Sequence, residues 1–552
     1  MEGTKHLANK EGTEDEEDLL RVLEPDAVLK ELLQKLSETQ VLESKTGIGE
    51  YNLKPLTTFE GVRGYEEVER YWVRDPFSFV VILFTEKDNE FLYHVVEPAL
   101  TVFERALLEK IYDDLRDILI LEEIPTEAKK SEILKQKTKK LVQGYKIPLS
   151  PSSLDKILYY TERNYIGYGF IDPLLKDQSI EDISCDGVDV PVFLYHKKYQ
   201  NIKTNIVMDE DELDLFVTTL AQRCGKHLSA GRPMVSATMP EGSRLQATLG
   251  REISARGSSF SIRKFSENPF TPVELIRFGT FSVDMLVYLW MAIENNRSLI
   301  FAGGTASGKT SSLNAVSLFI PPISKIITIE DTRELTLYHE NWIASVTREP
   351  FITGEDSAID MYELLRQALR QRPEYIIVGE IRGAEALTLF QAMSTGHTTY
   401  STMHAGNVQE VVSRLENEPI NVPSVMLQAL DIISVQALLY VGKERVRRTY
   451  IIVELTGIDP NTGDIRINVL FKWNPVNDTF ERIGDSHVLR EIMKQRGWTL
   501  TELNAEMENR KKVLQYLIEK DIRYYMDIAR IVQMYYQNPD RVLKNIADGV
   551  YI

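Results

Sequence analysis

The sequence has few cysteines and no long hydrophobic run. Only two of its 552 residues are cysteine, Cys185 and Cys224, and they form no C-x-x-C pair, so we expect neither a disulfide framework nor a cysteine zinc site. No apolar run approaches the roughly 20 residues that span a bilayer. Acidic residues stand near the N-terminus, where a signal peptide needs a basic and then an apolar stretch. We therefore expect a cytoplasmic chain with, at most, a peripheral membrane role.

Basic residues are also in the minority. The chain has 64 Lys and Arg against 82 Asp and Glu, a formal net charge of -18, which argues against a generic nucleic-acid surface. A local basic site stays open, because Lys443, Arg445, Arg447 and Arg448 cluster beside a predicted hairpin turn at 460–463. The hydrophobic content of 43% is that of an ordinary folded protein. The length predicts roughly three or four folded units.

A short glycine-rich stretch carries the clearest chemical signal. Residues 303–310, Gly-Gly-Thr-Ala-Ser-Gly-Lys-Thr, match G-x-x-x-x-G-K-[ST], the pattern of a loop that binds nucleotide phosphates. Glycines let backbone N–H groups approach the phosphates, the next helix begins with its positive end there, Lys309 adds a charge, and the Thr310 hydroxyl can ligate Mg²⁺. An apolar strand at 299–301 and a helix at 311–319 supply the context that a chance Gly/Ser turn lacks. The residues predicted to bind ATP are Gly303, Gly304, Thr305, Ala306, Ser307, Gly308, Lys309, Thr310 and Ser311.

Strands alternate with helices after this loop. The pattern predicts strands at 325–329, 375–378 and 398–402 and helices at 360–371 and 384–394. Such alternation is typical of a parallel sheet with helices on both faces. The ligand of such a sheet lies at the carboxyl ends of its strands. Polar side chains that follow directly after these strands are therefore candidates for the site.

Two carboxylates at these strand ends are candidates for catalysis. Glu380 follows a predicted strand where a P-loop ATPase places its metal-side carboxylate, but Gly379 stands where such strands usually carry Asp. We therefore predict that Glu380 holds Mg²⁺ through water, together with Thr310; the alternative is that Glu380 only begins the next helix. Glu330, which we prefer over Glu334, is predicted to orient or deprotonate the attacking water.

Two histidines and two arginines complete the set of candidates. His397 and His404 bracket the strand at 398–402, and we expect both to sense the phosphate or a catalytic carboxylate, although an isolated histidine is usually structural. Arg244 and Arg263 lie on two short strands predicted in the preceding α+β region. They either form surface salt bridges or, as in ring ATPases, neutralise charge in the transition state.

Five ordered motifs resemble those of one family. The stretches 303–310, 329–334, 364–373, 377–383 and 395–404 closely resemble the Walker A loop, Asp box, Walker B strand and His box of the type II/IV secretion ATPase superfamily. The resemblance covers about residues 150 to 480. It implies an α/β chain in which a RecA-like P-loop ATPase domain follows an α+β, PAS-like N-terminal domain, with helical extensions at both ends. It also implies a hexameric ring that hydrolyses ATP with Mg²⁺.

The resemblance assigns roles motif by motif. Lys309 and Thr310 would contact phosphate and Mg²⁺, Glu330 would be the catalytic carboxylate, Glu380 the Walker B carboxylate and His404 the His-box residue. Arg244 and Arg263 match the arginines of the family's N-terminal domain more loosely. The four-cysteine zinc insertion of bacterial type II members is missing from this sequence, so we expect no metal besides Mg²⁺.

Within the superfamily, the stretches 278–282, 400–406 and 414–423 are most similar to the archaeal branch, and above all to the archaellum motor ATPase. Members of that group assemble and rotate the archaellum through a polytopic membrane platform protein, with accessory cytoplasmic archaellum proteins. We therefore expect a homo-hexamer, peripheral at the inner face of the cell membrane, with no nucleic-acid partner. The alternatives are the ATPase of an archaeal adhesive pilus or a type II secretion-like system, a nucleic-acid translocase, and a catalytically silent scaffold.

Composition and the resemblance together predict the domain order. The first 20 residues are polar and acidic and predict a disordered tail, and a helix is expected at 27–36. The predicted segments are the tail and helical extension at 1–60, a mixed strand and helix region at 61–150, an α+β ATPase subdomain at 151–267, a linker at 268–272, a RecA-like motor domain at 273–484 and a helical region at 485–552.

Overall fold

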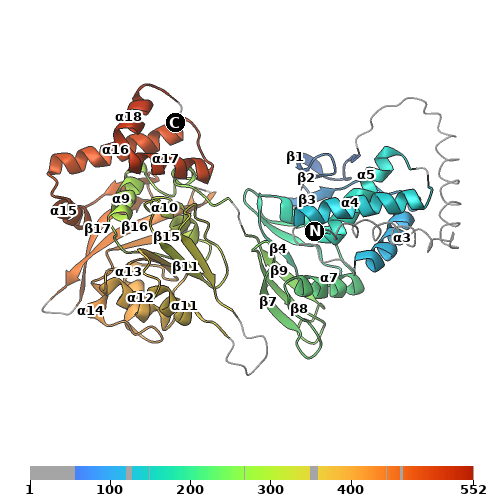
Figure 1. Cartoon of the computed structure of the whole chain (residues 1–552), viewed down its shortest axis with the longest axis horizontal. Helices are drawn as coiled ribbons and strands as arrows, with labels where there is room; N and C mark the ends of the chain where they lie inside the picture. Colours follow the sequence, from blue (N-terminus) through green and yellow to red (C-terminus); the bar gives the residue numbers. More distant parts are fainter. Residues whose placement is uncertain are drawn as a thin grey trace, which may run out of the picture. The chain divides into compact units, whose positions relative to one another are not determined.

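The computed structural model describes residues 56–119, 127–147, 149–265, 268–348, 358–442, 444–459 and 464–550. The predicted acidic tail, the helix at 27–36 and the hairpin turn at 460–463 lie outside these residues. The chain divides into two compact units, Met1–Lys264 and Phe265–Ile552. In Figure 1 the first unit is coloured blue to green and the second green to red. Each unit has its own sheet and its own hydrophobic core.

The N-terminal unit is built on one mixed sheet with the strand order β1-β2-β3-β6-β5-β4-β9-β8-β7. Its strands are β1 (Glu66–Arg74), β2 (Ser78–Thr85), β3 (Glu90–Val96), β4 (Ile180–Cys185), β5 (Phe193–His196), β6 (Gln200–Thr204), β7 (Met234–Thr238), β8 (Arg244–Thr248) and β9 (Ser259–Arg263). Neighbours are antiparallel except β3 and β6, where Leu92 pairs with Lys203 in parallel. This pairing joins the strands before residue 105 to the α+β region, so one sheet runs through both.

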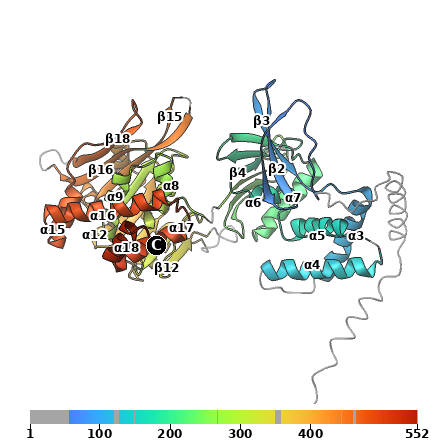
Figure 2. The same cartoon turned by 90° about the horizontal axis from the view of Figure 1, so that it is seen from above.

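Three helices of this unit pack on one another. They are α3 (Val102–Leu119), α4 (Glu127–Gly144) and α5 (Pro151–Tyr165), and Figures 1 and 2 show them side by side. Leu107 and Ile111 of α3, Leu134 of α4 and Ile157 of α5 are buried at their contact. A short helix, α6 (Asp172–Lys176), then leads into β4.

One helix, α7 (Glu210–Arg223), covers one face of strands β8 and β9 in the N-terminal sheet and leaves their other face without this cover. This helix begins at a capping box in which the side chains of Asp209 and Glu212 bind each other's backbone N–H groups. Its buried Leu213 and Val217 belong to the same core as Phe260 of β9. Because successive side chains of a strand point to opposite faces, the polar residues that alternate with this core lie on the other face of β8 and β9.

The C-terminal unit has a second sheet, with the strand order β12-β11-β13-β14-β10-β15-β16-β17-β18. Its strands are β10 (Leu299–Gly303), β11 (Ile326–Glu330), β12 (Trp342–Val346), β13 (Tyr375–Val378), β14 (Thr398–Met403), β15 (Ile432–Val441), β16 (Glu444–Ile458), β17 (Ile465–Asn474) and β18 (Thr479–Arg482). Strands from β12 to β15 in this order are parallel, and β15 to β18 are antiparallel. The predicted parallel sheet is confirmed, and β12, β15 and β18 are strands that the sequence pattern did not predict.

Helices cover both faces of the parallel strands (Figure 1). One face packs against α8 (Pro272–Arg277), α9 (Val283–Glu294) and α10 (Lys309–Ser317), and the other against α11 (Met361–Leu369), α12 (Glu385–Ser394), α13 (Val408–Glu416) and α14 (Ser424–Leu427). Successive residues of each strand belong alternately to the two hydrophobic cores. Phe301 and Ile377 belong to the core with α9, whereas Ile300 and Ile376 belong to the core with α12. Both faces of the parallel strands are therefore buried from solvent, as in other parallel sheets.

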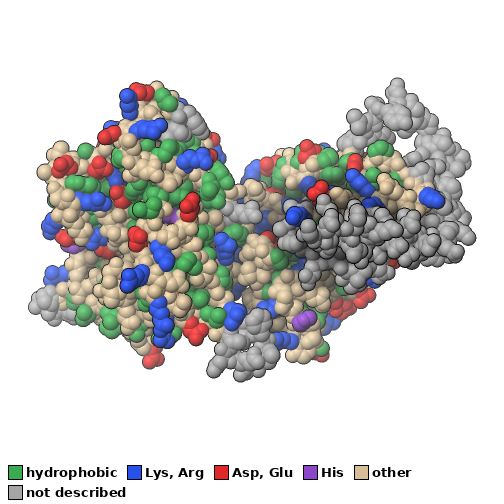
Figure 3. Space-filling view, viewed as in Figure 1, with side chains coloured by type: hydrophobic (Ala, Val, Ile, Leu, Met, Phe, Trp, Pro, Cys, Tyr) green, Lys and Arg blue, Asp and Glu red, His purple; other side chains and the backbone are tan. Residues whose placement is uncertain are grey.

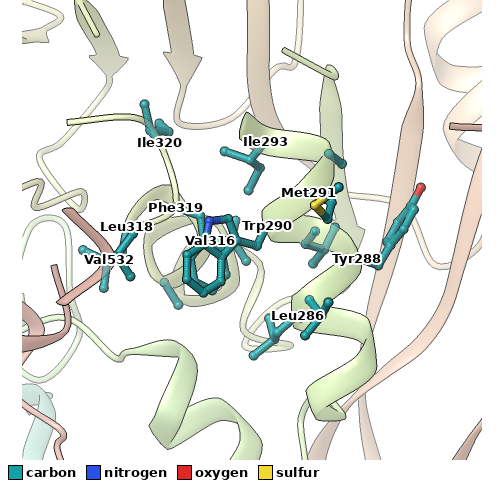
Figure 4. Packing of buried hydrophobic residues seen from close by; sticks show 14 of the residues in the cluster. Leu286, Tyr288, Trp290, Met291, Ile293, Val316, Leu318, Phe319, Ile320 and Val532 are labelled. Carbon is teal, nitrogen blue, oxygen red and sulfur yellow. The ribbon is translucent and has the colours of Figure 1, made fainter. Parts of the chain in front are cut away.

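The last helices of the chain extend the first of these cores. They are α15 (His487–Arg496), α16 (Leu500–Glu519), α17 (Tyr525–Gln537) and α18 (Pro539–Ala547). Trp290 of α9 stacks on Phe319 with ring centroids 4.9 Å apart (Figure 4), and its Nε1 donates to Tyr536 Oη at 3.0 Å. Tyr536 in turn donates to the Phe319 carbonyl oxygen at 2.7 Å. The aromatic residues of the C-terminal helices are thus packed against α9.

Charged side chains of both signs are interspersed on the face shown in Figure 3. Exposed ion pairs such as that of Arg490 with Asp485 at 3.0 Å contribute little to stability. Within the described ranges, no helix combines the length and the hydropathy that a bilayer span requires.

Candidate active site

The glycine-rich loop connects β10 to α10. β10 ends at Gly303 and α10 begins at Lys309, so the predicted strand-loop-helix context is present. A Cβ on Gly303 would collide with the carbonyl oxygen of Gln436 and with Ser307 Oγ. Gly308, at the N-cap of α10, has a φ of 91°, which favours glycine. The loop's path therefore depends on glycine at both ends.

Several hydrogen-bond donors converge inside the loop. The Gly304 carbonyl oxygen accepts from Lys309 Nζ at 2.8 Å, from Ser307 Oγ at 2.8 Å and from the Ser307 N–H at 3.4 Å. The first turn of α10, whose N–H groups have no acceptor within the helix itself, begins at the same place. A positive helix end, an ammonium group and a set of inward donors fit a polyphosphate. The residues present therefore fit ATP, with Thr310 placed in the first turn of α10 as an oxygen ligand for Mg²⁺.

The tips of four parallel strands meet at this edge of the sheet. In the order β11-β13-β14-β10, Ile329 pairs with Val378, Val378 with Ser401 and Ala302 with Met403. Glu330, His404 and the phosphate loop follow directly after these paired residues, and Glu380 follows Val378 after one intervening residue, Gly379. The structure therefore brings Glu330, Glu380 and His404 to the same edge as the loop, with the two carboxylates on adjacent strand tips.

Glu330 is a buried carboxyl group that forms no ion pair with the described residues. Its side chain is 2% exposed, and Oε1 accepts from the backbone N–H groups of Glu334 at 2.9 Å and Leu335 at 3.0 Å. Oε2 has no hydrogen-bond partner among the described residues. Burial raises the pKa of Glu330 to about 8, against the opposing effect of the two N–H groups. A carboxyl group with a pKa near neutrality can exchange a proton with a water molecule at working pH.

Glu380 is held between two other side chains. One carboxylate oxygen accepts from Arg382, which also lies 3.6 Å from Asp331. The other lies 3.8 Å from His404 Nε2. Burial and the nearby charge of Lys309 lower the pKa of His404, so neutral imidazole is favoured near pH 7. A neutral His404 can donate to or accept from a carboxylate or a phosphate oxygen.

The structure does not bring His397 to this edge. His397 directly precedes β14, whereas His404 directly follows it, and a six-residue strand separates the two by roughly 20 Å. The Nδ1 atom of His397 lies 3.3 Å from Thr395 Oγ1. The expectation that both histidines face the phosphates is therefore corrected for His397, because the residue before a strand lies at the opposite edge of the sheet.

Arg244 and Arg263 belong to the N-terminal unit. They are directly paired across β8 and β9, on the face opposite α7, and Arg263 Nε lies 3.5 Å from Asp182. Together with Tyr195 and Gln246 they line a groove of about 450 Å³. The structure thus brings the two arginines together, which their separation in the sequence did not predict.

Two residues near the loop were missed as site candidates. Arg382 is the partner of Glu380, and its place two residues after that glutamate was the available signal. Arg447 Nε donates to the Ala306 carbonyl oxygen at 2.9 Å, although the sequence placed it only in a basic cluster. Nothing in the local pattern shows that β16 passes beside the loop.

Comparison with known proteins agrees with this geometry. Residues 188–464, half of the chain, match the family model described as type II/IV secretion system protein. The chain belongs to this family. The predicted fold class and ATPase activity are confirmed for this secretion ATPase. Residues 29–99 and 476–550 match models described as PilB3-like, N-terminal and C-terminal.

Relatives of this secretion ATPase come from archaea and bacteria. Uncharacterized protein MJ0900 of Methanocaldococcus jannaschii is 35% identical over 85% of this chain and 88% of its own length. Type IV secretion system protein PtlH of Bordetella pertussis is 30% identical over 44% of this chain and 78% of its own. Among solved structures, the VirB11 ATPase of Brucella suis is 25% identical over 50% of this chain and 90% of its own, with a TM-score of 0.26. The Legionella pneumophila ATPase DotB is 18% identical over 69% of this chain and 96% of its own, with a TM-score of 0.39.

Proposed function

We propose that this secretion ATPase is a hexameric motor that hydrolyses ATP to assemble or move an archaeal type IV pilus-like filament through a membrane platform protein. The observation that carries the chemical part is the meeting of Glu330, Glu380 and His404 with the phosphate loop at one edge of the sheet. The archaeal relative MJ0900, similar over most of its length, supports the archaeal setting.

The choice of filament has two candidates. The sequence motifs resemble the archaellum motor ATPase most, which favours filament rotation. The PilB3-like matches on both flanks of the ATPase domain favour pilus assembly instead. They extend over 29–99 and 476–550, segments that lie outside the shared ATPase motifs, so we place pilus assembly first and the archaellum second.

The proposal assigns a role to each residue of the candidate site. Lys309 and the N–H groups of the loop bind the phosphates, and Thr310, with Glu380 through water, would hold Mg²⁺. When bound, Mg²⁺ neutralises charge on the phosphate oxygens. Glu330 orients the attacking water and, in its ionised form, takes its proton, and His404 hydrogen-bonds the phosphate or Glu380. The proposal keeps for Arg244 and Arg263 the role that the resemblance implies, which is to neutralise charge in the transition state.

Turnover by the full chain tests the chemical part. We expect Lys309→Ala and Glu330→Gln to lower ATP hydrolysis at least 100-fold while the chain stays folded. Undiminished hydrolysis by both variants would overturn the assignment of the site. DNA that stimulates turnover would favour the nucleic-acid translocase over the filament motor.

Deletion of the gene in its host tests the filament. We expect loss of adhesive surface filaments with swimming retained, whereas loss of swimming alone would favour the archaellum. Recovery of a polytopic membrane protein with the affinity-tagged chain, and a particle mass of six chains with nucleotide, would support the platform partner, the peripheral position at the inner membrane face and the hexamer. Accessory cytoplasmic archaellum proteins in the same fraction would favour the archaellum.

A further inference from the structure

The β15–β16 hairpin lies beside the phosphate loop. β15 runs parallel to β10 with Gly303 opposite Gln436, and a Cβ on Gly303 would collide with the Gln436 carbonyl oxygen. The pairing of β15 with β16 shifts register between Val435 and Gln436, where Thr449 Oγ1 donates to Gln436 Oε1 at 3.1 Å. These contacts fix β16 close enough for side chains on one of its faces to reach the loop.

Consecutive arginines of β16 point in different directions. Arg448 is buried and donates to both carboxylate oxygens of Asp478 at 2.8 Å. Arg447 donates instead from Nε to the Ala306 carbonyl oxygen at 2.9 Å. Arg445 is exposed on the same side of the strand as Arg447 and makes no hydrogen bond or ion pair with the described part of the chain. Among the described residues of this basic cluster, Arg447 is thus the one with a hydrogen bond to the phosphate loop.

The bond from Arg447 fixes the direction of one peptide group. Ala306 has a φ of 59°, a left-handed conformation that is uncommon without glycine. Its carbonyl oxygen points to Arg447, and because the C=O and N–H of a trans peptide point in opposite directions, the Ser307 N–H points the other way, into the loop. There it approaches the Gly304 carbonyl oxygen at 3.4 Å, the same oxygen to which Lys309 Nζ donates. The Ser307 N–H thus belongs to the set of donors that fits a phosphate.

We propose that Arg447 is a positioning residue of the nucleotide site, which holds the Ala306–Ser307 peptide with its N–H directed at the nucleotide phosphates. A flipped peptide would turn a carbonyl oxygen toward the phosphates and remove one donor. The Nε–H to carbonyl bond carries this effect, and the charge of the guanidinium is secondary. The inference rests on the proposed function, because it concerns the same ATP site.

Three variants of the full chain test this role. Arg447→Ala removes the bond, and Arg447→Gln keeps it without the charge, because the Gln Nε2 occupies the place of the Arg Nε along the side chain. Arg445→Ala removes an equal charge from the same face. We expect Arg447→Ala to raise the Kd for ADP and the KM for ATP about tenfold, with kcat changed less than about twofold. The other two variants should stay within about twofold of the wild type.

Thermal unfolding separates a binding defect from a folding defect. Without nucleotide, all three variants should unfold at the wild-type temperature, because Arg447 lies at the surface of the loop. ADP should raise the unfolding temperature of the wild type, and this increase should be smaller only for Arg447→Ala. The inference is overturned when Arg447→Ala binds ADP as Arg445→Ala does, or when Arg447→Gln binds as weakly as Arg447→Ala. Failure of the wild-type chain to bind ADP or ATP would overturn the proposed function itself.

Discussion

Glu330 Cγ lies 3.2 Å from the position that a Cβ on Gly379 would occupy. The backbone of Gly379 cannot move away easily, because its N–H donates to the Ile329 carbonyl oxygen at 2.8 Å and its carbonyl oxygen accepts from Thr402 Oγ1 at 2.7 Å. Glycine at the end of β13 therefore leaves room for the carboxyl group at the end of β11. The Asp that such strands usually carry would put a second carboxylate beside Glu330.

Gly379→Ala is expected to lower kcat about tenfold, because the added methyl group displaces Glu330 from its place, and small displacements of a catalytic group are costly. The KM for ATP should change little. Steady-state hydrolysis measures both constants. Gly383→Ala is the matched control, since its Cβ would meet only the end of the Glu385 side chain at 3.2 Å, which can move. Equal kcat values for the two variants would show that the space beside Glu330 is not needed.

The raised pKa of Glu330 predicts a pH-dependent stability. Burial raises the pKa of Glu330 from 4.5 to about 8, so the folded chain favours the protonated form. The contribution to stability is complete below about pH 4.5 and is lost as pH rises toward 8 and beyond. Glu330→Gln cannot ionise and lacks this loss. The unfolding temperature of the wild type should therefore fall relative to that of Glu330→Gln between pH 5 and pH 9.

The comparison across pH is the informative one, because the Gln amide adds a buried donor that shifts stability by a constant amount. A difference between Glu330→Gln and the wild type that stays constant from pH 5 to pH 9 would mean that Glu330 is ionised throughout.

β10, β11 and β13 were predictable because each is a short, mainly apolar run buried on both faces. β13 has the predicted bounds, Tyr375–Val378, and the strand ends then placed Glu330 and Glu380 at one edge. β12 escaped prediction since it is an edge strand with mostly half-exposed side chains. Its weak apolar pattern does not differ from that of a loop.

Pairings between distant segments could not be predicted from local patterns. The β3–β6 pair joins residues about 110 positions apart, and the register shift at Val435 and Gln436 brings Arg447 to the phosphate loop. Neither leaves a periodic signal in the sequence. His397 is a different case, because its place before β14 already implied the far edge, and the interpretation grouped it with His404 because the two bracket the same strand.

The two histidines that flank β14 provide a matched pair of variants. His404→Ala should lower kcat at least tenfold, because it removes the imidazole that lies 3.8 Å from the Glu380 carboxylate. His397→Ala should leave kcat within about twofold of the wild type, since His397 precedes the strand and lies at the other edge. Steady-state ATP hydrolysis by the two purified variants measures this difference. A loss of similar size in both would contradict the placement of the site at one edge.

Arg510 is the buried charge that ties α16 to α9. Its side chain is 3% exposed, pairs with Glu294 and with Glu506, and lies over the ring of Trp290 at 5.6 Å. Arg510→Ala removes the nearer ion-pair partner of the partly buried Glu294, whose other partner, Arg496, lies 3.7 Å away, so we expect a loss of about 3 kcal/mol in the free energy of unfolding. Urea unfolding followed by tryptophan fluorescence measures the loss.

The neighbouring Lys511 is the control for Arg510. Lys511 pairs with Asp284 at 2.8 Å, but both side chains are about a third or more exposed, and such a surface pair contributes less than about 1 kcal/mol. Lys511→Ala should therefore unfold nearly as the wild type does. If Arg510→Ala costs no more than Lys511→Ala, the C-terminal helices are held to α9 without help from the ion pairs of Arg510, by contacts such as those of Trp290 with Tyr535. The ion pairs would then contribute nothing that the apolar packing does not already supply.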